Sequence, residues 1–326
     1  MAYLRAMRIF LCFFLSVALS GDTLRLLFWN LENCFDPRPD STSVSELDFS
    51  AFGSRRWSRK RYDRKIFQIA KTVLWTAREP TGGDPRLPDV AGFAELEKKR
   101  ILTDLVRGTA LRKLDYVPVH FESPDPRGID VGLIYRKSVL TLLRASPVHI
   151  LDSAGVILPT RDILLAEFLM RGGDSLAILV CHFPSKYGGA SVSMPKRQAA
   201  VLRLEALTDS LSRRGFRRLV AMGDFNDTPD RIAPKGLVNA ARTLWKKGRG
   251  TIRYEGTWEL IDMFFVSPPL AEVADMRIPD PPFLLTRDRR YGGRKPLRTY
   301  SGPRYLGGVS DHLPILLFLP LPSAPP

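Results

Sequence analysis

Short apolar runs recur along this chain, and polar or turn-forming residues bound most of them. Runs of this length and composition are typical of β-strands. They predict strands over residues 24–29, 89–94, 131–135, 163–168, 176–181, 219–222, 261–266 and 313–319. Longer amphipathic segments predict helices over residues 61–77, 98–106 and 193–213. Because several strands follow one another with no helix between them, the pattern favours an α+β fold of packed sheets over a doubly wound parallel sheet.

The N-terminal residues have the pattern of a secretory signal peptide. Arg5 and Arg8 precede an apolar run over residues 9–19, and the small residue Ser20 comes directly before Gly21. The run is much shorter than the roughly 20 residues that span a bilayer, so a membrane anchor is the less favoured interpretation. We therefore expect residues 1–20 to be cleaved and the mature protein to be secreted or periplasmic.

The remaining sequence contains no repeat, heptad pattern or long linker at which it could be divided. One domain over residues 21–320 is therefore expected, followed by a Pro-rich flexible tail over residues 321–326. Cys34 and Cys181 are too few for a disulfide framework. They could form one bridge or stay as buried free thiols, and the thiols are favoured because both lie at ends of apolar runs.

The chain is strongly basic, with a formal net charge of +15. Loss of Arg5 and Arg8 with the signal peptide (15 − 2) leaves +13. A charge of this size attracts polyanions, including nucleic acid and anionic lipid. It does not identify the chemistry, which depends on individual side chains.

Polar residues suited to catalysis stand where the predicted strands begin or end, namely Asn30, Glu32, Glu95, His182, Asp224, Asn226, Asp311 and His312. Strand ends of a rigid scaffold suit a preorganised site. Several carboxylates without cysteine favour a hard cation, magnesium first and manganese or calcium as alternatives, over zinc. Glu32, Glu95 and Asp311 are the best ligand candidates. The two histidines are then left for proton transfer or for contact with an anionic transition state, a combination that suits phosphate ester hydrolysis.

Seven segments, in this order, resemble the endonuclease/exonuclease/phosphatase superfamily, and most closely its secreted bacterial members. They are FWNLEN (28–33), AGFAELE (91–97), SPDPRGIDVGLIYR (123–136), CHFPSKYGG (181–189), MGDFND (222–227), ELIDMFFVS (259–267) and GGVSDHLP (307–314). The superfamily includes pancreatic deoxyribonuclease, abasic-site endonucleases, sphingomyelinases and inositol polyphosphate phosphatases. The resemblance implies a DNase I-like fold, a four-layer α/β/β/α sandwich of two packed mixed β-sheets, and a metal-dependent phosphoesterase activity.

The resemblance also implies roles for the acidic and amide residues. Glu95 would be the principal metal ligand, with Glu32 and Asp311 as direct or water-mediated ligands. Asn30 would bind the scissile phosphate or hold the carboxylates of the site. The remaining two, Asp224 and Asn226, would align the attacking water and bind phosphate oxygens, and which group acts as the base stays open.

Two histidines receive roles from the same resemblance. His312 would be the acid/base or phosphate-stabilising imidazole, oriented by Asp262, and His182 would be a second imidazole, oriented by Asp130. A carboxylate on one ring nitrogen fixes the tautomer and raises the basicity of the other. The other two histidines, at positions 120 and 149, lie in no motif and are expected to be structural or exposed.

Two basic clusters are candidates for contact with the substrate. The first basic cluster, residues 55–65, and the second basic cluster, residues 287–304, each carry seven basic residues and interleaved aromatic rings. Such segments can follow a phosphate backbone and stack on bases. The first cluster could instead be a solvated helix face, so the second, which leads into Asp311 and His312, is favoured. Arg127 lies in the third of the seven matching segments and could also hold a phosphate. The substrate-binding candidates are therefore Arg127, Arg294, Lys295 and Arg298.

The leading function is a magnesium-dependent phosphodiesterase, an endonuclease acting on nucleic acid outside the cytoplasm. The alternatives are a phosphatase or sphingomyelinase-like lipid phosphodiesterase, and, from another class, a catalytically inactive polyanion-binding protein. No apolar hairpin for docking on a membrane is recognised, and every residue type expected for catalysis is present. Nothing in the sequence implies a stable protein partner, so a monomer is expected.

Overall fold

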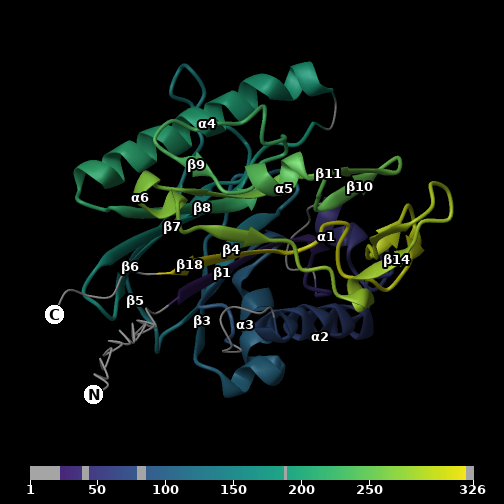
Figure 1. Cartoon of the computed structure of the whole chain (residues 1–326). Coiled ribbons are helices and arrows are strands. Elements are labelled where there is room, and N and C mark those ends of the chain that lie inside the picture. Colours follow the sequence, from purple (N-terminus) through teal and green to yellow (C-terminus); the bar gives the residue numbers. More distant parts are fainter. Residues whose placement is uncertain (1–22, 39–43, 79–85, 187–188, 321–326) are drawn as a thin grey trace, which may run out of the picture.

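The computed structural model describes residues 23–38, 44–78, 86–186 and 189–320. The expected signal peptide and C-terminal tail lie outside these residues. Two six-stranded sheets pack together at the centre, and helices cover their outer faces (Figure 1). This is the α/β/β/α arrangement that the resemblance implied. Within the described ranges, no helix has both the length and the apolar character needed to cross a membrane.

The first sheet has the strand order β13-β18-β1-β2-β4-β3. Its strands are β1 (Thr23–Cys34), β2 (Val90–Leu96), β3 (Tyr116–His120), β4 (Asp130–Arg136), β13 (Asp275–Arg277) and β18 (Ile315–Pro320). The two central strands β1 and β2 pair in parallel, and the other pairings are antiparallel. The sheet is therefore mixed, and β1 is paired on both sides.

The second sheet has the order β5-β6-β7-β8-β12-β9. Its strands are β5 (Leu140–Val148), β6 (Ile163–Met170), β7 (Ser175–His182), β8 (Arg218–Asp224), β9 (Val238–Asn239) and β12 (Asp262–Val266). It is mixed in the same way, because only the central pair β7 and β8 is parallel among its described pairings. Each sheet thus has one parallel pair at its centre, where two neighbouring strands end at the same edge.

Long helices form the outer layers. The helix α4 (Ala190–Arg213) covers the second sheet, while α2 (Arg59–Trp75) and α3 (Lys99–Gly108) lie against the first (Figure 1). Short helices lie in the loops, namely α1 (Val44–Asp48), α5 (Arg242–Lys246), α6 (Pro268–Ala271) and the 3-10 turns Thr76–Arg78, Ala110–Lys113 and Pro282–Leu284. Three small hairpins complete the fold: β10 (Ile252–Tyr254) with β11 (Thr257–Glu259), β14 (Leu285–Arg287) with β15 (Arg294–Pro296), and β16 (Tyr300–Ser301) with β17 (Arg304–Tyr305).

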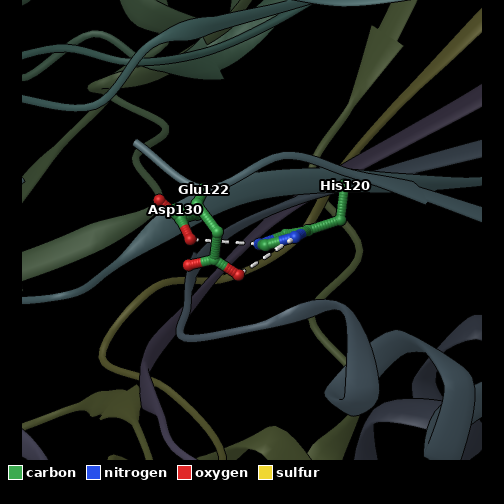
Figure 2. A group of neighbouring side chains, drawn as sticks. All are labelled: His120, Glu122 and Asp130. Carbon is green, nitrogen blue, oxygen red and sulfur yellow. Dashed lines mark hydrogen bonds and ion pairs between the residues drawn. The ribbon is translucent and has the colours of Figure 1, made fainter. Parts of the chain in front are cut away.

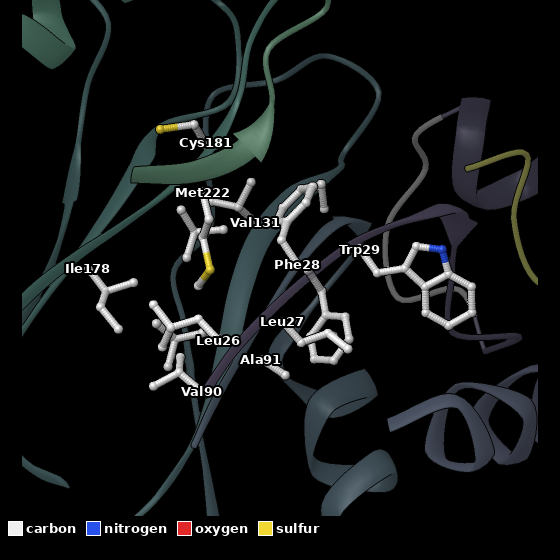
Figure 3. Close-up of a cluster of buried hydrophobic side chains, with 14 of the residues drawn as sticks. Leu26, Leu27, Phe28, Trp29, Val90, Ala91, Val131, Ile178, Cys181 and Met222 are labelled. Carbon is white, nitrogen blue, oxygen red and sulfur yellow. The ribbon is translucent and has the colours of Figure 1, made fainter. Parts of the chain in front are cut away.

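The core lies between the inner faces of the two sheets (Figure 3). Leu26, Phe28 and Ile178 are fully buried there. The sheets approach closely at Gly92, where a Cβ atom would lie 2.6 Å from the terminal methyl of Met222. This close packing fixes the position of one sheet relative to the other.

Cys34 lies in β1 and Cys181 in β7, and both are buried free thiols. No disulfide bridge joins these two residues. The free thiols agree with the prediction made from their places at the ends of apolar runs. Burial raises the pKa of the Cys34 thiol to about 11. Both side chains act as small apolar groups within the sheets.

Every strand predicted from an apolar run is present, as are all three predicted helices. The apolar pattern missed all four edge strands, of which β9 and β13 are only two and three residues long, and the longer β3 and β5 are less apolar. Pro118 interrupts the first, and Arg144 and other exposed residues interrupt the second. Edge strands have one unpaired side and need less burial, so their sequences carry a weaker signal.

Candidate active site

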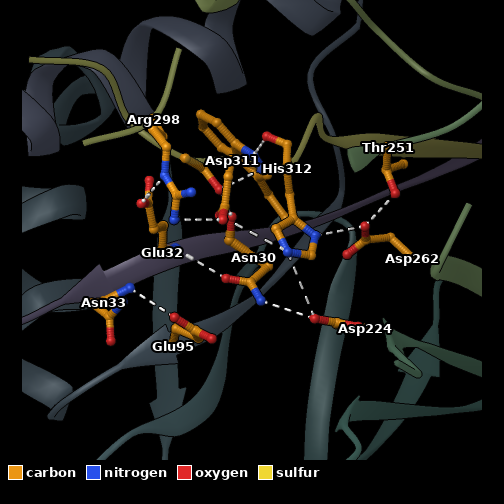
Figure 4. A network of polar contacts seen from close by, with 12 residues as sticks. Asn30, Glu32, Asn33, Glu95, Asp224, Thr251, Asp262, Arg298, Asp311 and His312 are labelled. Atoms are coloured by element: carbon orange, nitrogen blue, oxygen red, sulfur yellow. Dashed lines mark hydrogen bonds and ion pairs between the residues drawn. The ribbon is translucent and has the colours of Figure 1, made fainter. Parts of the chain in front are cut away.

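Most of the predicted catalytic and metal-binding residues meet at one edge of the two packed sheets, and Figure 4 shows Asn30, Glu95 and His312 among them. Parallel pairing brings the end of β1 beside the end of β2, and the end of β7 beside the end of β8. In the second sheet His182 is opposite Asp224, which is in turn opposite the first residue of β12, Asp262. The loop before β18 adds Asp311 and His312. Five strand ends and one loop, far apart in sequence, therefore form one site.

The backbone is strained where these side chains leave the strands. Glu32, Asn33, Glu95 and Asn226 have φ angles of 48°, 54°, 59° and 52°. Glu95 also has no pairing partner on either side, because the register shifts there against both β1 and β4. Left-handed backbone in non-glycine residues is unfavourable, and bulges redirect side chains out of a sheet. Strain of this kind gathers at functional sites, and here it directs carboxylates toward one point.

His312 is held by a buried carboxylate. Its Nδ1 lies 2.8 Å from Asp262 Oδ2, and the Thr251 hydroxyl donates to the same oxygen. Its Nε2 faces Asp224 Oδ2 at 3.9 Å. Burial alone would lower the pKa of His312, but the carboxylates of Asp262, Asp224 and Asp311 outweigh it and raise that pKa well above its usual value. The structure thus pairs His312 with Asp262 as the resemblance implied, and this pairing favours the charged form of its imidazole.

His182 has the opposite character. Burial first, and then the positive charges of Arg161, Arg127 and His312, lower its pKa well below the usual value. Its Nε2 lies 3.7 Å from Asp224 Oδ2 and 3.9 Å from Glu95 Oε1, beyond hydrogen-bond range. Its buried Nδ1 has no hydrogen-bond partner in the described part of the chain. The neutral imidazole therefore faces the site through Nε2.

The expected pairing of Asp130 with His182 is wrong in this structure. Asp130 Oδ2 lies 3.1 Å from Nε2 of His120, and its Oδ1 accepts a hydrogen bond from the Ser123 backbone (Figure 2). The reason is register: His120 is on β3, which pairs directly with the strand that begins at Asp130. His120 is accordingly a buried partner of Asp130, with Glu122 Oε1 3.9 Å from its other nitrogen.

A residue that no motif identified holds the backbone at His182. The buried Arg161 donates from Nε to the His182 carbonyl at 3.2 Å and from Nη2 to the Phe183 carbonyl at 2.7 Å. Its Nη1 donates to Asp125 Oδ2 at 2.9 Å. Asn226 Nδ2 donates to the Phe183 carbonyl as well, at 2.9 Å. Arg161 precedes an apolar run, and nothing in the sequence distinguishes it from a surface arginine.

Asp224 lies at the centre of the site. Asn30 donates from Nδ2 to its Oδ2 at 3.0 Å, and the Asn226 backbone donates to its Oδ1 at 2.9 Å. Burial, and then the charge of Asp262, raise the pKa of Asp224 to about 7. Such a carboxyl group can both hold and release a proton near neutral pH, which is the property required of a general base.

Arg298 joins two of the predicted metal ligands. Its Nε donates to Glu32 Oε1 at 2.9 Å, and its Nη2 lies 3.0 Å from Asp311 Oδ2. The Thr299 backbone donates to the other Glu32 oxygen at 2.8 Å. Beneath them the buried Lys65 ammonium donates to the Glu32 carbonyl at 2.7 Å and to the Thr299 hydroxyl at 2.9 Å. Neither Lys65 nor Thr299 carried a motif signal.

Glu95 lies on the other side of the site from this arginine. Its Oε2 accepts a hydrogen bond from the Asn33 backbone at 2.9 Å, and the Arg127 guanidinium lies 3.6 Å from the same oxygen. Arg127 also donates to the Asn33 side chain at 2.8 Å. The motif arginine is therefore at the site, half exposed, where it can reach a bound anion.

The remaining two basic candidates lie apart from these residues. Arg294 and Lys295 are on β15, in a hairpin at the far right of Figure 1 near β14. The Arg294 guanidinium points to the Pro282 carbonyl, and the Lys295 ammonium lies 3.4 Å from Asp288. Of the second basic cluster, the structure therefore brings Arg298 to the site and leaves these two outside it.

The donor set fits a hard divalent cation. Carboxylate oxygens dominate, and burial followed by the charge of Asp311 raises the pKa of Glu32 to about 7. Glu95 Oε1 accepts no hydrogen bond from any described residue, which leaves it free to bind a metal. Glu32 and Asp311 do not form a close three-residue ligand group with Glu95 in the described structure. Arg298 engages one oxygen of each of these two carboxylates.

The two imidazoles and the central carboxylate can act together on a phosphate ester. A charged His312 can donate to a phosphate or leaving-group oxygen, while Asp224 can accept a proton from an attacking water. Their surroundings raise the pKa of His312 well above its usual value and that of Asp224 to about 7, which suits His312 to the acid role and Asp224 to the base role. A divalent cation, when bound, would supply charge stabilisation for the phosphate oxygens.

Comparison with known proteins agrees with this geometry. A family model described as Endonuclease/Exonuclease/phosphatase family matches residues 25–320. No curated protein matches the sequence significantly. Among solved structures, a Bacteroides thetaiotaomicron endonuclease/exonuclease/phosphatase family protein is 16% identical, with a TM-score of 0.57, and 92% of this chain and 98% of that one are covered.

Two further structures share the fold. The mannosyl-6-phosphatase of Bacteroides thetaiotaomicron is 16% identical (TM-score 0.55; 91% of this chain and 99% of that one covered). The catalytic domain of human nocturnin with bound sulfate is 15% identical (TM-score 0.55; 91% and 96%). At these identities the likeness shows the fold alone. The family model, by contrast, matches nearly the whole described chain, and this chain therefore belongs to the endonuclease/exonuclease/phosphatase family.

Proposed function

We propose that this protein is a magnesium-dependent phosphodiesterase that cuts nucleic acid outside the cytoplasm. The observation that carries the proposal is the convergence of the Asp262–His312 pair, His182 and Asp224 beside the unengaged oxygen of Glu95. These groups supply a proton donor, a proton acceptor and a cation ligand around one point. Location outside the cytoplasm rests on the signal-peptide pattern of residues 1–20.

In the proposed reaction a water attacks phosphorus, one phosphorus–oxygen ester bond breaks, and the leaving oxygen takes a proton. Asp224 accepts the proton of the water, and His312 donates from Nε2, which faces Asp224 at 3.9 Å. Asp262 keeps the His312 ring in place through its 2.8 Å contact with Nδ1. Arg127 and Arg298, both half exposed at the border of the site, contact the charged phosphate oxygens.

The choice of a nucleic acid over a small phosphate ester rests on charge. The mature chain carries an excess of thirteen positive charges (15 − 2), and arginines border the site on two sides. The sharpest alternative is a sugar phosphate, because a structural neighbour is described as a mannosyl-6-phosphatase. A monomeric protein is expected in either case.

One substrate panel tests the proposal. The mature protein, beginning at Gly21, is incubated with supercoiled plasmid, single-stranded DNA, RNA, bis-p-nitrophenyl phosphate, mannose 6-phosphate, inositol phosphates and sphingomyelin. We expect nicking of plasmid and release of p-nitrophenol with magnesium or manganese, loss of both with EDTA, and recovery when metal is restored. His312→Ala, purified in parallel, controls for contaminating nuclease.

Three outcomes would contradict parts of the proposal. Activity that survives chelation removes the metal requirement. Release of phosphate from mannose 6-phosphate without plasmid nicking would show that the substrate is a sugar phosphate and not a nucleic acid. Equal activity of His312→Ala and the unmodified protein removes the assigned acid. The location is checked separately, by the mass of the protein recovered from culture medium or periplasm, which should begin at Gly21.

A further inference from the structure

The two basic clusters, which are far apart in sequence, meet beside the active site. Arg55 of the first cluster donates from Nη1 to the Gly302 carbonyl of the second. The Tyr300 hydroxyl donates in return to the Arg55 carbonyl at 2.9 Å. The Arg55 guanidinium also lies 5.4 Å from the Tyr300 ring centroid. The two clusters therefore join at Arg55, while Arg59, Lys60 and Arg64 stay exposed on the helix α2.

A small cavity opens at this junction. It has a volume of about 130 Å³ and is lined by Glu32, Phe49, Arg55, Arg298, Tyr300 and Gly302. At about 30 Å³ per water molecule it has room for about four waters. Pockets that enclose whole small molecules measure about 300–1,000 Å³. This cavity, the arginine pocket, is thus the size of one small chemical group.

The charge of the arginine pocket fits an anion. The lining carries two guanidinium groups, those of Arg55 and Arg298, and one carboxylate, that of Glu32, while Asp311 contacts Arg298 from the catalytic side. The Glu32 carboxylate already accepts hydrogen bonds on both oxygens, from Arg298 and from the Thr299 backbone. Within the described residues, Nη1 of Arg298 and both Nε and Nη2 of Arg55 have no hydrogen-bond acceptor. Guanidinium groups bind phosphate oxygens in a planar, often bidentate geometry.

The pocket shares one residue with the catalytic site. Arg298 contacts Asp311 with Nη2 and Glu32 with Nε, and its guanidinium also lines the arginine pocket. An anion bound there would therefore contact the same guanidinium group that contacts Asp311 of the catalytic site. Phe52, three residues before Arg55, is fully exposed, and its Cα lies within about 11 Å of that of Arg55 along the chain. An exposed ring at this distance can stack on a base.

We propose that the arginine pocket binds the phosphate group next to the one that is cut. This inference rests on the proposed function and deepens it, since a second phosphate one nucleotide away is a feature of nucleic acid strands. A substrate with a single phosphate leaves the pocket unused. The enzyme is therefore selective for substrates with neighbouring phosphates, and Arg55 contributes to specificity and not to the chemical step.

Three dinucleotides test this selectivity. Thymidylyl-thymidine has one phosphate (TpT), and its derivatives carry a second at the 5′ end (pTpT) or the 3′ end (TpTp). We expect kcat/KM for one of the two derivatives to exceed that for TpT by at least about tenfold, the effect of a charge-assisted hydrogen bond. The comparison requires only the unmodified enzyme, so it does not depend on how any variant folds.

Variants then assign the selectivity to the pocket. Arg55→Gln should reduce the ratio between the favoured derivative and TpT to below about threefold, while Arg55→Lys should retain part of it, because the charge remains and the planar fork is lost. The double variant Arg112→Gln, Lys113→Gln removes two exposed positive charges elsewhere and should leave the ratio unchanged. A ratio within each enzyme is insensitive to any general loss of activity.

The outcomes separate this inference from the proposed function. Equal cleavage of all three dinucleotides by the unmodified enzyme, or an Arg55→Gln ratio equal to that of the unmodified enzyme, would overturn the arginine pocket alone. Nicking of plasmid without cleavage of any dinucleotide would overturn the arginine pocket alone. Hydrolysis of bis-p-nitrophenyl phosphate without cleavage of any dinucleotide or of plasmid would overturn both the pocket and nucleic acid as the substrate. Absence of hydrolysis of every one of these phosphodiesters would overturn the proposed function itself and the pocket with it.

Discussion

Replacing Asp262 by asparagine removes the negative charge beside His312 and hardly changes the size of the side chain. Asp262 is fully buried at the start of β12, and its Oδ2 lies 2.8 Å from His312 Nδ1. Thr251 donates to the same oxygen. The amide can still occupy the space and accept from one donor, but it cannot offset the positive charge of the imidazole. The perturbation therefore isolates the electrostatic part of the pair.

The size of the effect follows from this contact. A hydrogen bond to a charged group contributes about 1.5–3 kcal/mol, and each 1.36 kcal/mol of barrier is tenfold in rate. Asp262→Asn should therefore lower kcat by about 10-fold to 150-fold. The comparable change in a serine protease triad, about 10⁴-fold, is an upper limit. KM should change little, because the imidazole is needed most when charge develops on the leaving oxygen.

The assay is the initial rate of p-nitrophenol release from bis-p-nitrophenyl phosphate at saturating magnesium, with kcat and KM measured separately. Asp162→Asn is a matched control, because Asp162 Oδ2 lies 2.8 Å from His149 Nδ1 in a second pair outside the site. It should keep normal kinetics. Thermal unfolding of each variant checks the fold. A kcat for Asp262→Asn within about twofold of the unmodified enzyme, or an equal loss in Asp162→Asn, would refute the reasoning.

Two further predictions concern stability and the thiols. Asp125→Ala leaves the buried Arg161 without its carboxylate and should lower the free energy of unfolding, measured by urea titration, by about 3–5 kcal/mol. The control Asp174→Ala removes a carboxylate that is 56% exposed and should lower it by about 1 kcal/mol or less. Equal losses in the two variants would contradict the burial argument. Cys34 and Cys181 should both react with a thiol reagent in the denatured protein but hardly at all in the native protein at pH 8. The reason is that a thiol with a pKa of about 11, such as Cys34, is ionised at pH 8 in only about one molecule in a thousand. Native reactivity should rise with pH, and a non-reduced mass two hydrogens lower would show a bridge instead.

Strands and helices were predictable because their signals are local. The apolar runs that form β1, β2, β7 and β8 are buried on both faces, so almost every residue in them is apolar. The residues at the ends of these runs, such as Asp224, are conspicuous because a carboxylate directly after a buried strand seldom stabilises the fold. The edge strands gave no such signal.

Contacts between side chains were less predictable, because they depend on register. From the sequence alone, Asp130 could be the hydrogen-bond partner of either His182 or His120. The antiparallel pairing of β3 with β4 selects His120. Arg161 and Lys65 hold carbonyl groups of the site from beneath it. A backbone acceptor has no identity in the sequence, so neither residue could be assigned a role before the fold was known.

The sequence by itself determined the family, the packed mixed sheets and the set of polar groups at the strand ends, since each of these depends on residues close together in the chain. Only the tertiary structure decided which of those groups are neighbours. It brought Arg298 between Glu32 and Asp311, placed Arg55 beside it, and left Arg294 in a separate hairpin. The physical reason is that burial and periodicity are properties of a segment, whereas the distance between two charges depends on how all the segments between them pack.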